Sequence, residues 1–168
     1  MGFVTCDNPD LEVNHMGTTF VSLQHESSED EIGFWMRDGI LELWLRLLAL
    51  HLPESPENHS MGYEIRRNWL LASGVHFGGC VPHELHLATA TEEGRKLVRM
   101  AIVSLMQRLA KAPATLNGPT LDLLGMEGTF ANEFETWRLI EVGDAFLNLL
   151  DGKLECTVKS TAFMPGSK

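Results

Sequence analysis

The chain has 168 residues, of which 44% are hydrophobic, and a formal net charge of −10 at pH 7. That length and composition predict one globular domain over residues 1–168 with a substantial core. The negative charge argues against general binding to nucleic acid or to an anionic membrane, because both attract cationic proteins.

The cysteines are three in number, Cys6, Cys80 and Cys156, and the chain does not open with a basic stretch followed by an apolar run. An odd cysteine count without a secretory leader predicts a reduced, cytoplasmic protein without a disulfide framework.

The first 26 residues have no long helical period and are predicted to be irregular, except for a short strand over residues 18–23. The sequence there, TTFVSL, has the β-branched and aromatic content of a strand.

Residues 28–52 hold the strongest pattern, SEDEIGFWMRDGILELWLRLLALHL. Apolar side chains recur at helical spacing around most of the circumference, which predicts one long helix buried at the centre of the domain. The polar residues Asp38, Glu42 and Arg46 form the remaining strip and are expected to be its solvent edge. Together with Arg37, these charges exclude a membrane span, since each costs about 3 kcal/mol near the middle of a bilayer. The apolar stripe consists of Ile32, Met36, Ile40, Leu43, Leu47 and Leu50.

Two further helices follow in the middle of the chain. Ser60 is a suitable cap for a helix over residues 60–73, with Gly74 as a left-handed stop. A second helix is predicted over residues 89–111, because Thr89 and Glu92 have the spacing of a capping box.

The last helix is predicted to start after Asn132 and to end before Gly152. An alternative makes residues 135–142 a strand and begins the helix at Gly143. Residues 154–158 alternate between apolar and polar side chains and are predicted to form a strand that pairs with residues 18–23. Residues 163–168 are expected to be a free tail.

These elements predict a mainly α fold, a single-domain bundle of four principal helices around residues 32–52, with a small β pairing of the two ends of the chain. Leu121, Leu123 and Leu124, in the turn-rich stretch before the last helix, are expected to cover part of the core.

A cluster of potential metal ligands precedes the helix over residues 89–111: His76, Cys80, His83 and His86. Imidazole and thiolate suit zinc, so the hypothesis is a zinc-type site, either in a metal-binding domain or in a hydrolase. The sequence His83-Glu84-Leu85-His86 is one residue short of the HExxH motif of metalloproteases. The alternative is that these histidines are ordinary loop and helix-end residues and that Cys80 is a small buried apolar group.

The helix over residues 89–111 has a basic outer face, a local reversal of charge in an acidic chain. It favours either an ordinary solvated helix face or the binding of an anion or an acidic partner. The face consists of Arg95, Lys96, Arg99, Arg108 and Lys111.

No motif for phosphate-binding loops or for a serine nucleophile occurs: GxxxxGK[ST], GxGxxG and GxSxG are all missing. With a net charge of −10, this favours a non-enzymatic interaction protein, an inhibitor or immunity-like protein that binds a basic partner protein. The sequence predicts no cofactor other than the zinc of the alternative.

Overall fold

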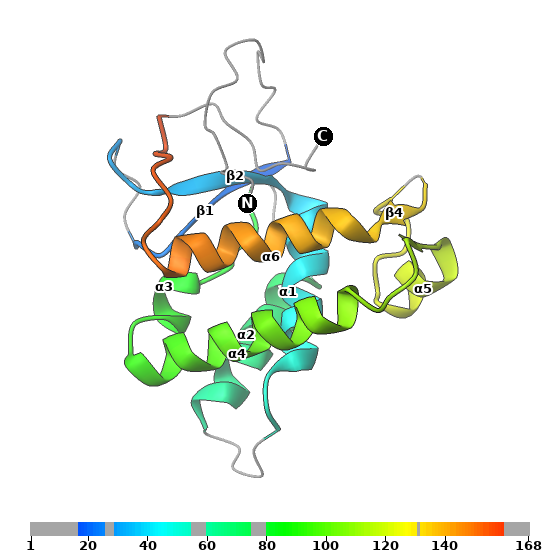
Figure 1. Ribbon diagram of the computed structural model, residues 1–168, viewed down its shortest axis with the longest axis horizontal. Helices are drawn as coiled ribbons and strands as arrows, with labels where there is room; N and C mark the ends of the chain where they lie inside the picture. Colours follow the sequence, from blue (N-terminus) through cyan, green and yellow to red (C-terminus); the bar gives the residue numbers. More distant parts are fainter. Residues whose placement is uncertain (1–16, 26–28, 55–59, 75–79, 131, 160–168) are drawn as a thin grey trace.

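The computed structural model describes residues 17–25, 29–54, 60–74, 80–130 and 132–159. The fold is mainly α, with six helices and two small antiparallel sheets in this part of the chain (Figure 1). The predicted tail at 163–168 and most of the predicted irregular N-terminal segment lie outside the described residues. The elements are β1 (Thr18–Ser22), β2 (Gly33–Arg37), α1 (Asp38–His51), α2 (Met61–Ala72), α3 (Leu85–Ala88), α4 (Glu92–Leu109), β3 (Thr115–Leu116), α5 (Gly118–Leu123), β4 (Phe134–Glu135) and α6 (Thr136–Leu150).

The first half of the predicted central helix is a strand, so the prediction of one helix over residues 28–52 is wrong there. β2 pairs with β1 in antiparallel register, with Val21 opposite Phe34. Phe34 and Met36 point into the core while Trp35 lies on the other face, which is the two-residue alternation of a strand. A side chain at position 33 would overlap the carbonyl oxygen of Val21, so the close pairing needs Gly33.

The second half of the predicted helix is α1, which follows β2 directly. It packs against α2 and α4, and α4 also packs along α6; in Figure 1, α4 and α6 lie side by side in front of α1. Leu41, Leu43 and Leu45 are fully buried, whereas Leu50 at the far end is 65% exposed and leaves the predicted stripe. None of the helices in the described part of the chain combines the length and hydrophobicity that a bilayer-spanning segment needs.

The polar strip of α1 is an internal contact and not the predicted solvent edge. Glu42 is buried, and the Asp38 carboxylate accepts a hydrogen bond of 2.7 Å from the Thr19 hydroxyl. The Arg46 guanidinium donates to the carbonyl oxygens of Ser73, at 2.8 Å, and Leu124, at 2.9 Å. Arg46 therefore joins α1 both to the end of α2 and to the segment after α5.

The other helices form close to where the sequence places them, with different details at their ends. The Ser60 hydroxyl accepts from the amide of Tyr63 and caps α2, as predicted. Gly74 is not in the left-handed region, because the positive-φ glycines of the described residues are elsewhere. The cap of α4 is Thr91, two residues later than the predicted Thr89.

Helix α6 is continuous through Gly143, so the alternative of a strand over residues 135–142 is wrong. Only Phe134 and Glu135 are extended, and they pair with β3. Gly143 lies within α6 where it meets α4: a Cβ there would come within 2.7 Å of the Met106 side chain. The glycine therefore serves close helix packing and does not interrupt the helix.

The C-terminal segment pairs with the start of β2 and not with β1, so the predicted pairing of residues 154–158 with 18–23 is wrong. The amide of Gly33 donates to Cys156 at 3.0 Å, and the amide of Val158 donates to Glu31 at 2.9 Å. Ile32 and Thr157 form an isolated antiparallel bridge.

Cysteine usage also departs from the prediction. Cys156 is buried and disulfide-bonded, whereas Cys80 is exposed and is the free cysteine of the described residues. The expectations of a chain without disulfides and of a buried Cys80 are therefore wrong, and the cysteine count no longer supports a reducing compartment.

Candidate functional site

The four predicted zinc ligands have different surroundings. His76 lies outside the described residues. Cys80 lines a shallow, mainly apolar pocket beside α2. The His86 ring stacks edge-on against His25, with ring centres 4.7 Å apart.

His83 uses both ring nitrogens inside the fold. Its Nε2 lies 3.1 Å from the carbonyl oxygen of Phe20, and its Nδ1 accepts a hydrogen bond of 3.2 Å from the amide of Leu85. Burial, with a smaller contribution from His86, lowers the pKa of His83 to about 4. The ring is thus neutral at pH 7, with the proton on Nε2, and neither nitrogen has a lone pair directed to a ligand.

Within the described ranges, no three histidine, cysteine or carboxylate side chains are grouped so that they could hold a metal. Because His76 is outside those ranges, the four-ligand zinc site stays a prediction. Binding zinc there would require His83 to release a backbone partner, and elemental analysis of protein purified without chelator tests it directly.

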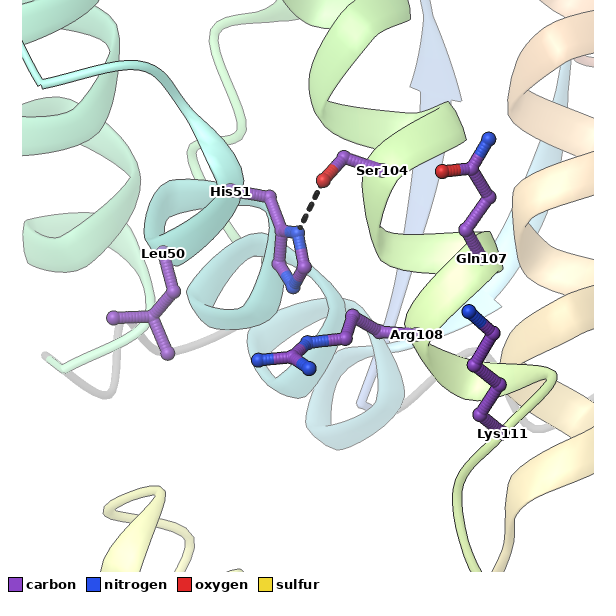
Figure 2. A pocket seen from close by; sticks show the side chains of 6 residues that line it. All are labelled: Leu50, His51, Ser104, Gln107, Arg108 and Lys111. Atoms are coloured by element: carbon purple, nitrogen blue, oxygen red, sulfur yellow. Dashed lines mark hydrogen bonds between the residues drawn. The ribbon is translucent and has the colours of Figure 1, made fainter.

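A polar hollow of about 400 Å³ lies between the C-terminal ends of α1 and α4 (Figure 2). The Nδ1 atom of His51 and the hydroxyl of Ser104 are 2.9 Å apart. In Figure 2, Arg108 extends from α4 toward α1, and its guanidinium lies below the His51 ring. Burial first, and the charge of Arg108 second, lower the pKa of His51. Gln107 and Lys111 complete the lining.

The basic face of α4 is not uniform. The Arg95 side chain donates to the carbonyl oxygen of Thr89, and Arg99 forms an ion pair with Asp151. Of the basic residues that remain, Arg108 and Lys111 line the hollow. The contacts thus divide the predicted face into structural arginines and cations that face a concave surface.

The second surface feature is the acidic lobe, which we define as residues 112–135 without residue 131. It contains β3, α5 and β4 and projects beyond the ends of α4 and α6 (Figure 1). The segment carries four carboxylates and neither lysine nor arginine. Leu123, predicted to cover the core, is instead 89% exposed. The carboxylates belong to Asp122, Glu127, Glu133 and Glu135.

No family model, no curated protein and no solved structure matches the chain. The residues that sequence reasoning missed are His51 and Ser104, which are 53 positions apart and meet only through the packing of α1 on α4. A usable signal for the acidic lobe was present in the sequence: a 24-residue stretch with carboxylates and no basic residue.

Proposed function

We propose that this is a non-enzymatic interaction protein that binds a basic partner protein through the acidic lobe. One observation carries the proposal: Leu123 is 89% exposed in a segment that has carboxylates and no basic residue. Exposed single leucines are common on protein surfaces, but one in a segment whose only charged side chains are carboxylates offers both an apolar anchor and electrostatic selection.

The lobe is held firmly enough to present Leu123 in a defined position. Arg46 donates to the carbonyl oxygen of Leu124, the residue next to Leu123. The rings of Phe130 and Phe134 pack edge-on with centres 5.0 Å apart. A surface fixed in advance loses less conformational entropy on binding, which favours affinity.

The charge of the lobe defines the chemistry of the partner. Asp122 and Glu127 are exposed, and so is Glu133, whose carboxylate accepts a hydrogen bond from Thr115. A complementary surface would carry lysine or arginine around an apolar recess that receives Leu123. Masking such a surface is what an inhibitor or an immunity-like protein does, and that is the biological role we propose.

The experiment compares two variants with the same net charge. The lobe variant replaces three exposed carboxylates, Asp122→Asn, Glu127→Gln and Glu133→Gln. The control variant replaces three exposed carboxylates elsewhere, Asp30→Asn, Glu54→Gln and Glu64→Gln. Each loses three negative charges, which changes the net charge from −10 to −7.

Partners captured from native lysate at low salt are identified by mass spectrometry, purified and titrated by calorimetry. A basic protein should bind the wild type and the control variant alike. It should bind the lobe variant and Leu123→Ser about tenfold or more weakly, since charged and apolar anchors each contribute roughly 1 to 2 kcal/mol. Equal weakening by both triple variants, or no basic partner, would contradict the proposal.

A further inference from the structure

The hollow between α1 and α4 contains two cationic side chains that form no ion pair with the described residues. Among the ion pairs of the described residues, none involves Arg108 or Lys111. Both side chains line the same concave surface.

Neutral donors lie beside these cations. If the Ser104 hydroxyl donates to Nδ1 of His51, as the 2.9 Å contact allows, the ring carries its proton on Nε2. Figure 2 shows that nitrogen on the side of the ring nearest Arg108. A guanidinium and an imidazole N–H are then available within one site, with the Lys111 ammonium on a flexible stem and the Gln107 amide at its edge.

We infer that this hollow binds the phosphate group of a small phosphate monoester. A tetrahedral dianion has several acceptor oxygens and suits a guanidinium, an ammonium and an N–H donor together. The volume of about 400 Å³ exceeds what one phosphate needs and falls in the range of small-molecule sites. Leu50, 65% exposed at the rim, provides a surface for the apolar body of the ester. This inference is independent of the acidic lobe.

The test is an NMR titration of the full chain at pH 7.5 and constant ionic strength, with inorganic phosphate, phenyl phosphate and phenol as probes. Phenyl phosphate should give saturable shifts of the His51 ring and of the Ser104 and Arg108 amides, and phenol should give none. We expect phenyl phosphate to bind about threefold or more tightly than inorganic phosphate, because Leu50 covers part of the ring. Leu50→Ser should remove only that difference.

Matched variants distinguish a specific phosphate site from general electrostatic attraction of the anion to the basic face of α4. Arg108→Gln and Lys111→Gln should each weaken phenyl phosphate binding about tenfold, as expected for the loss of a charge-assisted contact. Lys96→Gln changes the net charge equally on the same exposed helix face but lies outside the hollow, so it should leave binding unchanged.

Two results would show that there is no specific site: chemical shifts that never saturate with phenyl phosphate, or equal weakening of its binding by Lys96→Gln and Arg108→Gln. Equal affinity for inorganic phosphate and phenyl phosphate would also overturn the inference, because free phosphate would then be the ligand. The four substituted residues, Leu50, Lys96, Arg108 and Lys111, are all exposed. The variants should therefore fold, and their NMR spectra should stay dispersed. Partner binding by the acidic lobe should not change in Arg108→Gln, which distinguishes failure here from failure of the proposed function.

Discussion

Arginine and histidine occur in two kinds of surroundings in this protein: one pair is bonded to the backbone inside the fold, and the other lines an open surface. Arg46 and His83 are enclosed: the Arg46 guanidinium donates to backbone carbonyls of two segments, and both ring nitrogens of His83 have backbone partners. Arg108 and His51 line an open hollow, where Arg108 has no ion-pair partner among the described residues and His51 bonds through one nitrogen.

The difference shows that the role of a polar side chain is set by what its atoms contact, not by its type or its spacing. A donor that satisfies a buried carbonyl stabilises the fold and is not available to a ligand. The enclosed pair should therefore affect stability, and the open pair should affect binding and leave stability almost unchanged.

The largest effect is expected for Arg46. Arg46→Met keeps most of the apolar stem but removes the donors to Ser73 and Leu124. Loss of these charge-assisted bonds should lower the free energy of unfolding by about 3 kcal/mol. Urea denaturation followed by tryptophan fluorescence measures the change.

Arg108→Met is the matched control for that experiment. It removes the same charge from an exposed position, so its effect should stay within about 0.5 kcal/mol. Similar losses of stability in the two variants would remove the distinction between the enclosed and the open region.

The next largest effect is a dependence of the folding stability on pH that is due to His83. Its pKa is lowered to about 4 in the folded protein and returns to the ordinary value on unfolding. Between those values the unfolded chain binds the proton more readily, so stability falls as the pH is lowered. The contribution from pH 7 to pH 5 should be about 2 kcal/mol.

The comparison is made between wild type and His83→Gln, each unfolded in urea at pH 7 and pH 5. Groups that titrate in both proteins cancel, and the variant should lose about 2 kcal/mol less stability over this range. If the two proteins show the same pH dependence, His83 is not held neutral by its surroundings.

A smaller effect on stability is expected to distinguish the buried hydroxyl of Thr89 from the exposed hydroxyl of Ser104. Thr89 is buried and donates to the carbonyl oxygen of Leu85 at 2.7 Å, whereas Ser104 is exposed beside His51. Thr89→Val should cost about 1 kcal/mol, and Ser104→Ala should cost less than about 0.5 kcal/mol. Thermal unfolding by calorimetry measures both, and a larger loss in Ser104→Ala would contradict the assignment of Ser104 to an open surface.

The sequence predicts the mainly α class and the positions of α2, α4 and α6, because long amphipathic segments have a clear period. It fails over residues 33–37, where Met36 fits the predicted helical stripe but Phe34 and Met36 together also fit the alternation of a strand. The tertiary contact with Val21 decides that segment, and a single sequence does not contain it. The prediction that Arg46 faces solvent is wrong for the same reason, since its partners, the carbonyl oxygens of Ser73 and Leu124, are distant in the chain.

The candidate site depends still more on distant contacts. His83 and His86 stand out in the sequence because they are close together, yet the backbone partners of His83 give it a structural role. His51 and Ser104 do not stand out at all, and only the packing of two helices brings them together. Local spacing identifies sites whose ligands lie on one element, and this hollow is formed by two.

The smallest effect concerns the pKa of His51 and tests the electrostatics of the hollow directly. Burial is the main cause of its lowered pKa and the Arg108 charge the second, so Arg108→Gln should raise the pKa while leaving it below the ordinary value. The resonance of the His51 ring, followed by NMR from pH 5 to 8, reports the change. Lys96→Gln should leave the titration unaltered. An unchanged pKa in Arg108→Gln would mean that the guanidinium does not act on the ring, and the two groups could not then hold one anion between them.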